Sequence, residues 1–226
     1  PEFRRIRKIN TNFINLCLNE NLSSEITLQP LKRFELDAAI IFSDILMVPY
    51  ALNQKVEFIE NKGPELEKFD IGKFLNNDEY NFTKKLNSVY EAIKLTRKNL
   101  HKDKSLISFI GAPWTLLVYM IGAKIDKNEI DLKLIKEKKT EIKIILDKLN
   151  DYLCLHIENQ VRAGADVIQI FDSWAGLIPT NDLNEFCYNP NFKIVEFCKK
   201  KKIPVICFPK GIKENYKDFN NLVKPD

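Results

Sequence analysis

The chain has 226 residues, of which 45% are hydrophobic, so it is long enough and apolar enough to form one substantial domain with its own core. Its 35 Lys and Arg residues and 31 Asp and Glu residues leave a net charge of +4, which is too small and too scattered to indicate nucleic-acid binding. No apolar run approaches the length of a membrane span, and the first residues contain no signal-peptide core. We therefore expect neither nucleic acid nor a membrane as a partner.

The cysteines and histidines indicate free thiols and no metal. The cysteines are Cys17, Cys154, Cys187, Cys198 and Cys207. They are odd in number and contain no C-x-x-C pair, which predicts reduced thiols and a cytoplasmic location. His101 and His156 have no Cys, His or carboxylate at a spacing typical of metal ligands, so no metal is expected.

The first third of the chain predicts helices, a strand and a hairpin. Residues 1–19 carry apolar side chains at roughly helical spacing, and Ser23–Ser24–Glu25 can open a second short helix toward Leu31. The uninterrupted apolar run 38–42 predicts a strand buried on both faces, as in a parallel sheet covered by helices. Residues 56–60 alternate in polarity and end in Asn61–Lys62–Gly63–Pro64, which predicts a small hairpin.

The rest of the chain alternates helices with three further strands, predicted at residues 106–110, 166–171 and 204–208. We expect helices over 79–100 and 115–121, a mostly helical lysine-rich stretch over 127–163, and a helix over 181–202 that is interrupted near Pro190. This alternation predicts an α/β fold with a parallel sheet and right-handed crossovers. The sheet can be open and doubly wound or part of a (β/α)8 barrel.

Asp44 follows the first predicted strand and lies between Phe42 and Ile45. A carboxylate is costly to bury there unless nearby donors or a cationic ligand satisfy it, and strand ends are where α/β folds place their chemistry. The alternative is a helix N-cap, in which the side chain accepts an amide hydrogen from the next turn.

Two more strand-to-helix corners carry candidate residues. Gly111–Ala112–Pro113–Trp114 follows the second strand, and Asp172–Ser173–Trp174–Ala175–Gly176 follows the third. By spacing alone, Tyr119 in the helix after the first of these corners fits a core aromatic residue. Ser173 fits a helix cap in the same way.

Several blocks of the chain resemble uroporphyrinogen decarboxylases. They are Leu28–Gln29–Pro30, Asp37 to Pro49, Lys55–Val56–Glu57–Phe58, Lys62–Gly63–Pro64, Gly111 to Leu116 with Tyr119–Met120, and Gln169 to Gly176. The resemblance runs in register from Pro1–Glu2–Phe3–Arg4 to the strand at Pro204. It implies a carboxy-lyase that converts the four acetate side chains of uroporphyrinogen III to methyl groups without a cofactor, giving coproporphyrinogen III in heme and tetrapyrrole biosynthesis.

The resemblance also implies a fold and an assembly. The family folds as a distorted (β/α)8 barrel of the TIM type, and the four strands here look like its second to fifth. Residues 1–226 are therefore expected to form a single partial domain that is truncated at both ends. The family forms homodimers through the face around the cleft, so a homodimer is expected.

The resemblance assigns roles to four residues. Asp44 corresponds to the central catalytic aspartate, which also binds the substrate, and Tyr119 to the tyrosine that lines the cleft. Ser173 corresponds to the residue that hydrogen-bonds the tetrapyrrole, and Arg7 to an arginine that faces the substrate region. A surface ion pair is the alternative for Arg7. The family's R-Q-A-G-R-Y motif and C-terminal histidine have no counterpart in these residues.

Two other functions stay open at this point. One is a methyltransferase of the related barrel branch, in which His and Cys hold a zinc ion that activates a thiol. The other is a truncated, non-catalytic relative that binds a tetrapyrrole and retains Asp44 and Tyr119 but lacks the arginine motif.

Overall fold

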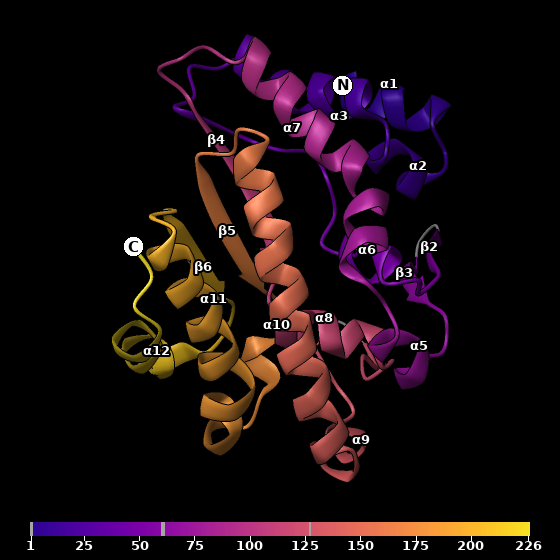
Figure 1. The fold of residues 1–226 in the computed structure, drawn as a ribbon, viewed down its shortest axis with the longest axis vertical. Helices are drawn as coiled ribbons and strands as arrows, with labels where there is room; N and C mark the ends of the chain where they lie inside the picture. Colours follow the sequence, from indigo (N-terminus) through magenta and orange to yellow (C-terminus); the bar gives the residue numbers. More distant parts are fainter. Residues whose placement is uncertain (1, 60–61, 127) are drawn as a thin grey trace.

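The fold is built on a parallel sheet of four strands in the order β1-β4-β5-β6 (Figure 1). The computed structural model describes residues 2–59, 62–126 and 128–226. The strands are β1 Ala38–Ile40, β4 Ser105–Gly111, β5 Val167–Asp172 and β6 Val205–Pro209, which confirms the four predicted strands. Every neighbouring pair is parallel. The carboxyl ends of all four strands therefore meet at one edge.

The two faces of the sheet differ in burial. Leu106, Ile168 and Ile170 are fully buried on the face that the helices cover, whereas Ile40 and Phe208 on the other face are 51% and 45% exposed. The expectation that the first strand is buried on both faces was therefore wrong. Within the described residues, helices pack against one face of the sheet, and the other face is the inner side of an incomplete barrel.

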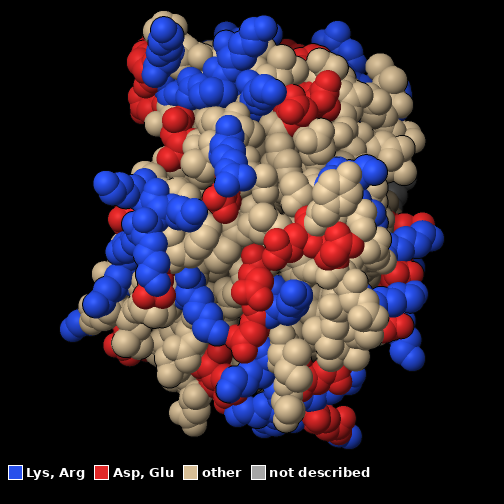
Figure 2. All heavy atoms as spheres, viewed as in Figure 1, with Lys and Arg blue, Asp and Glu red and all other residues tan. Residues whose placement is uncertain are grey.

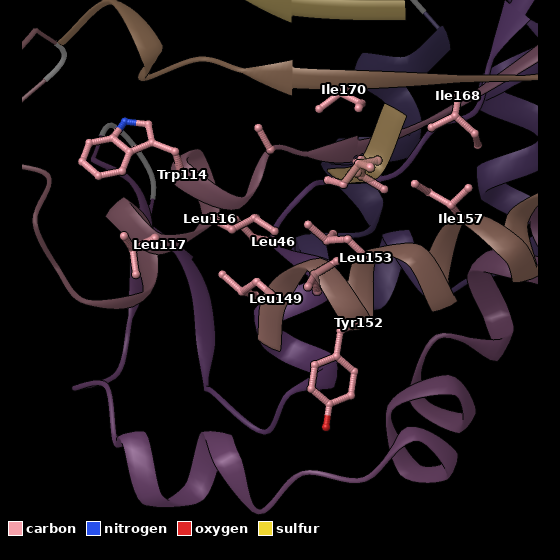
Figure 3. Close-up of a cluster of buried hydrophobic side chains, with 14 of the residues drawn as sticks. Leu46, Trp114, Leu116, Leu117, Leu149, Tyr152, Leu153, Ile157, Ile168 and Ile170 are labelled. Atoms are coloured by element: carbon pink, nitrogen blue, oxygen red, sulfur yellow. The ribbon is translucent and has the colours of Figure 1, made fainter. Parts of the chain in front are cut away.

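The helical layer packs on the sheet through a continuous apolar core. Its main helices are α7 Asn87–Asn99, α8 Pro113–Met120, α10 Lys139–Arg162, α11 Asn189–Lys200 and α12 Tyr216–Val223. Figure 3 shows Ile168 and Ile170 of β5 pointing toward Leu153 and Ile157 of α10, with Leu46 and Leu116 in the same cluster. Burying large apolar side chains of this kind contributes roughly 1.5–3 kcal/mol each before the entropic costs of folding.

The N-terminal helices pack on α7 through α3, which α1 and α2 contact (Figure 1). They are α1 Glu2–Ile9, α2 Phe13–Cys17 and α3 Glu20–Leu28, followed by the 3-10 turn η1 Pro30–Lys32. The predicted helix start at Ser23 was wrong by three residues. Asn19 is the N-cap, because its side chain accepts the Leu22 amide hydrogen, and Ser23 is buried inside the helix.

Shorter helical elements and a hairpin connect these layers, and the hairpin was predicted from the sequence. The remaining helical elements are α4 Met47–Ala51, α5 Ile71–Leu75, α6 Glu79–Lys85, α9 Leu132–Glu137, η2 Ala175–Leu177, η3 Thr180–Asp182, η4 Asn184–Tyr188 and η5 Lys213–Asn215. The predicted hairpin is β2 Val56–Ile59 paired with β3 Gly63–Leu66, and residues 60 and 61 of its turn lie outside the described residues.

Two predicted helices are interrupted. The helix expected over 79–100 is divided at Leu86, whose amide hydrogen is shared between the carbonyls of Phe82 and Thr83. The expected interruption near Pro190 is confirmed: η4 is a π-type turn, and α11 follows with Pro190 in its first turn, where a missing N–H is tolerated. The stretch 127–163 is helical in α9 and α10, and its first residue, Lys127, lies outside the described residues.

The surface charge is mixed. In the view of Figure 2, Lys and Arg are interspersed with Asp and Glu over the visible face. Within residues 2–59, 62–126 and 128–226, no helix combines the length and the apolarity that a bilayer crossing requires.

Arg97 joins α7 to the amino-terminal ends of β4 and β5. Its guanidinium donates to the carbonyls of Lys104 at 3.0 Å and His101 at 2.9 Å, and to Asp166 Oδ2 at 2.9 Å. Asp166 Oδ2 also accepts the Leu106 amide hydrogen at 2.7 Å. Since these bonds close the edge of the sheet opposite the carboxyl ends, they contribute to stability.

We predict that Arg97→Lys lowers the free energy of unfolding by about 1–3 kcal/mol, because an ammonium group cannot replace the planar fork of donors. The matched control is Arg162→Lys. Arg162 makes an exposed ion pair with Glu158 one turn away, so this change is expected to stay within about 0.5 kcal/mol. Urea denaturation of both variants measures the difference, and equal losses would contradict the role of the fork.

Candidate active site

A short irregular segment after β1 carries Asp44 to the carboxyl edge of the sheet. The Ile41 amide donates to the Ile107 carbonyl at 3.0 Å, which continues the β1–β4 ladder by one residue. The Phe42 amide donates to Thr27 Oγ1 at 2.8 Å, and the Thr27 hydroxyl donates to the Ser23 carbonyl at 2.7 Å. The segment is therefore held from both sides, by β4 and by α3, just before Asp44.

The Asp44 carboxylate is half-buried and only partly satisfied. Its Oδ1 accepts the Leu46 amide hydrogen at 2.8 Å, the one hydrogen bond that the described part of the chain provides to this side chain. Leu46 itself occupies the N-cap position of α4, so Asp44 caps the turn before the helix and is not its N-cap. A carboxylate has about four lone-pair positions, so most of its acceptor capacity stays open to a ligand.

The electrostatics of the site centre on Asp44. Burial raises its pKa to about 6, against the lowering effect of the Leu46 amide. Burial also raises the pKa of the Cys17 thiol to about 12, with a further rise from the Asp44 charge and an opposing effect from Arg7. Burial raises the pKa of the Tyr119 hydroxyl, and Asp44 raises it further. Asp44 therefore lies within electrostatic range of both Cys17 and Tyr119.

Tyr119 reaches the site from α8, which starts where β4 ends. Pro113 stands at the start of this helix, where its fixed φ and missing N–H are compatible with the first turn. The Tyr119 ring is half-buried and meets Trp174 edge-on, with the ring centroids 5.7 Å apart. Gly111 permits this corner: a Cβ there would lie 2.9 Å from Leu116 and 3.0 Å from Ile45, next to Asp44.

Ser173 is exposed at the carboxyl end of β5. The alternative that it caps a helix is not met, because the N-cap of η2 is Trp174 and this cap has no side-chain hydrogen bond. The loop that begins at Ser173 packs against the loop after β6. The Gly176 amide donates to the Lys210 carbonyl at 2.9 Å, and a Cβ on Gly176 would lie 2.6 Å from the Gly211 carbonyl oxygen.

Arg7 lies beside a groove of about 770 Å³ between α1, α2 and the hairpin. The groove is lined by Phe3, Arg4, Arg7, Lys8, Thr11, Phe13, Phe58, Ile59 and Gly63. The Arg7 guanidinium donates to the carbonyls of Asn10 and Thr11 and lies 5.3 Å from the centre of the Phe13 ring. These contacts hold Arg7 through main-chain carbonyls and an aromatic face. In the described part of the chain, the partners of Arg7 are thus carbonyl oxygens and an aromatic ring, and the surface ion pair that the sequence left as an alternative is not among them.

The sequence interpretation missed the aromatic and basic character of this groove. Phe13 packs against Phe42 and Phe58, with ring centroids 5.9 and 4.6 Å apart, and Phe3 packs against Phe42 at 5.5 Å. The i, i+4 spacing of Arg4 and Lys8 was an available signal that α1 presents a basic face. Ring contacts of Phe3 and Phe13 thus connect the groove to Phe42, two residues before Asp44.

Three of the four residues singled out from sequence, Asp44, Tyr119 and Ser173, lie on segments that leave the carboxyl ends of strands, whereas Arg7 lies on α1 and is linked to Asp44 through Cys17. Asp44 and Tyr119 interact electrostatically, Tyr119 contacts Trp174 next to Ser173, and Arg7 and Asp44 both act on Cys17. Over residues 2–59, 62–126 and 128–226, no group of three His, Cys, Asp or Glu side chains is placed to hold a metal ion.

Comparisons with known proteins agree on one family. The model of the uroporphyrinogen decarboxylase (URO-D) family matches residues 1–222. Uroporphyrinogen decarboxylases of Rickettsia bellii and Orientia tsutsugamushi are each 41% identical to this chain over 228 and 231 residues, covering 100% of the chain and 67% of each relative. The enzyme of Campylobacter jejuni is 42% identical over 220 residues, covering 94% of the chain and 64% of the relative. The chain spans about two thirds of the length of these relatives.

A solved structure of a methyltransferase from Methanosarcina mazei has a TM-score of 0.70 to this chain, covering 90% of the chain and 60% of the methyltransferase. Its sequence is 17% identical, so the likeness concerns the fold only.

We predict that Asp44→Asn raises the free energy of unfolding by about 2 kcal/mol at pH 7. The pKa in the folded state, about 6, lies above the usual value of 3.8, so the folded state binds the proton more tightly. Ionisation of Asp44 therefore costs stability above pH 6, and this cost disappears as the pH falls toward 4. Denaturation curves at pH 7 and pH 4.5 test this, because the gain should shrink to about a third of its pH 7 value at the lower pH. A gain of equal size at both pH values would contradict it.

Proposed function

Because the chain belongs to the uroporphyrinogen decarboxylase family, we propose that the protein removes carbon dioxide from the four acetate side chains of uroporphyrinogen III and forms coproporphyrinogen III. This is a cofactor-independent step of tetrapyrrole biosynthesis. Among the structural observations, the one that carries the proposal is the Asp44 carboxylate, which is half-buried at the carboxyl edge of the sheet with most of its acceptor capacity unused.

In the proposed mechanism, Asp44 holds the substrate by its centre. A porphyrinogen macrocycle is flexible and can dome, which turns its four pyrrole N–H groups toward a single acceptor. Hydrogen bonds to a charged acceptor contribute about 1.5–3 kcal/mol each. The Leu46 amide occupies one position on Oδ1 and orients the carboxylate, so the other positions face the macrocycle.

The same charge stabilises the reaction. Protonation of a pyrrole carbon next to the acetate places positive charge on the ring, which then accepts the electron pair released as the bond to carbon dioxide breaks. A carboxylate about 4 Å from that cation is worth roughly 4 kcal/mol at an effective dielectric constant of about 20. This corresponds to about three powers of ten in rate if the interaction acts only in the transition state. Asp44 therefore acts as an ionised electrostatic anchor.

The other three residues surround this centre in the proposal. Tyr119 lines the cleft beside Asp44, and the exposed Ser173 hydroxyl hydrogen-bonds the tetrapyrrole. Arg7, which lines the basic and aromatic groove, attracts the carboxylates at the rim of the substrate. Geometry supports this arrangement for Asp44, Tyr119 and Ser173, because they come from different elements that leave the carboxyl edge of the sheet.

Two rivals are less well supported. The methyltransferase alternative rests on a structural likeness at 17% identity, whereas relatives at 41% identity are uroporphyrinogen decarboxylases. A non-catalytic tetrapyrrole-binding protein would bind coproporphyrinogen and release no carbon dioxide, so an assay of turnover separates it from the proposal.

We further propose that residues 1–226 form a single partial barrel domain, that the protein is cytoplasmic, and that it forms a homodimer around the cleft. The five cysteines are all free thiols, which supports a reducing compartment. The family resemblance supports the dimer. Sedimentation of the natural polypeptide that contains this sequence is expected to show a dimer, and a monomer at all concentrations would contradict the assembly.

We predict that Asp44→Asn in the natural polypeptide lowers kcat for uroporphyrinogen decarboxylation by about 10²–10³-fold, because the amide retains the shape and the Leu46 hydrogen bond but removes the charge. The matched control is Asp37→Asn, an exposed carboxylate just before β1. Its kcat is expected to match wild type. Carbon dioxide release and porphyrin side-chain analysis measure both, and wild-type turnover by Asp44→Asn would remove Asp44 from its proposed role.

A further inference from the structure

Asp172, the last residue of β5, is a buried carboxylate immediately before Ser173 and is 1% exposed. Its side chain lies on the face covered by helices, away from the cleft. Oδ1 accepts the Thr115 hydroxyl hydrogen at 2.7 Å, and Oδ2 accepts from Asn191 Nδ2 at 3.1 Å and from the Cys187 thiol at 3.4 Å. Side chains from three elements, α8, η4 and α11, thus donate hydrogen bonds to this one side chain at the end of β5.

The donors and acceptors around Asp172 have a fixed direction. The Trp174 amide can only donate, and it donates to Thr115 Oγ1 at 3.2 Å. Thr115 then uses its one hydrogen toward Asp172. The Asn191 amide also donates to the Cys187 carbonyl at 2.8 Å, which can only accept, so its NH₂ group faces Asp172. Every contact therefore presents a donor to a carboxylate that accepts through both oxygens.

This network fixes the backbone on both sides of Ser173. Asp172 precedes Ser173 and is anchored through its side chain, while Trp174 follows it and is anchored through its amide to Thr115. The carbonyl of Trp174 accepts the Trp114 indole hydrogen at 3.2 Å. Ser173 is thus exposed on a segment whose two neighbours are held from the helical side.

The same network reaches Tyr119. Thr115 and Tyr119 are four residues apart and lie on one side of α8. The ring of Trp174, whose backbone amide donates to Thr115, meets the Tyr119 ring edge-on at 5.7 Å. Two groups proposed to contact the substrate, from different elements, therefore share one buried anchor.

Burying the Asp172 carboxylate costs free energy of solvation, which indicates that its hydrogen bonds are needed at this place in the fold. Burial raises the pKa of Asp172 to about 6, although the hydrogen bonds from Thr115, Asn191 and Cys187 lower it. An apolar residue would avoid this cost but would leave the Thr115 and Asn191 donors without an acceptor.

We propose that Asp172 is a positioning residue of the substrate cleft: through Thr115 and the Trp174 amide it holds Ser173 and Tyr119 in the arrangement that receives the tetrapyrrole. This inference rests on the proposed function for its substrate and adds a residue that does not itself touch the substrate.

The test uses the pair Thr115→Val and Thr115→Ser in the natural polypeptide. Valine has nearly the shape of threonine without the hydroxyl, whereas serine retains it. We expect Thr115→Val to lower kcat/KM by about tenfold or more and to raise KM, while Thr115→Ser stays within about threefold of wild type. Asp172→Asn is expected to resemble Thr115→Val, because its NH₂ group would face donors.

The control is Asp166→Asn, just before the other end of β5, where Asp166 accepts from Arg97 and the Leu106 amide. This variant is expected to unfold more easily but to retain wild-type kcat and KM when folded. In the control, any loss of total activity should equal the loss of folded protein. If Thr115→Val and Asp172→Asn also lose only as much activity as they lose folded protein, the positioning role is overturned.

A second readout needs no turnover. With 5-fluorotryptophan incorporated, the ¹⁹F resonance of Trp174, assigned by Trp174→Phe, is expected to shift in Thr115→Val and to keep its wild-type position in Thr115→Ser. An unchanged resonance in Thr115→Val would overturn the proposal. If the wild-type protein does not decarboxylate uroporphyrinogen, the proposed function fails, and the resonance still decides whether Asp172 and Thr115 position the loop.

Discussion

The parallel pairing of β1, β4, β5 and β6 is the constraint on which the rest of the structure depends. Because all four strands run in the same direction, the segments that leave their carboxyl ends meet at one edge. Asp44 follows β1, the helix with Tyr119 follows β4, and Ser173 follows β5. Asp44 thus comes within electrostatic range of Tyr119, and Tyr119 meets Trp174, although these residues are more than fifty positions apart in the chain. The opposite edge, closed by Arg97 and Asp166, serves stability.

Two carboxylates near the carboxyl edge of the sheet, the buried Asp172 and the half-buried Asp44, have different surroundings. Asp172 is surrounded by donors from three elements and faces the helices, so its acceptor capacity is used within the protein. Asp44 receives one amide hydrogen and is half-buried, so most of its acceptor capacity stays available. Burial raises the pKa of both groups to about 6. This difference in hydrogen bonding supports the two proposals, in which Asp172 belongs to the scaffold and Asp44 binds the ligand.

Hydroxyl side chains connect strand ends to helices in the same way at two places. Thr27 accepts the amide hydrogen of Phe42, which lies two residues before Asp44, and donates to the Ser23 carbonyl. Thr115 accepts the amide hydrogen of Trp174, the residue after Ser173, and donates to Asp172, the residue before it. A threonine hydroxyl suits this task because it accepts and donates at once, which lets a backbone amide that has left the sheet remain satisfied inside the protein.

The sequence by itself determined the four strands, most helices and the family, because apolar periodicity and long motifs are local properties of the chain. It also indicated that Asp44, Tyr119 and Ser173 follow or lie just beyond strand ends. Only the tertiary structure decided which face of each strand is buried, that Asp44 precedes the N-cap of α4, and that Arg7 is held by carbonyls and Phe13. It also revealed the contact between Thr115 and Asp172, 57 residues apart in the chain. The physical reason is that burial and hydrogen-bond partners depend on residues distant in sequence, which periodicity cannot identify.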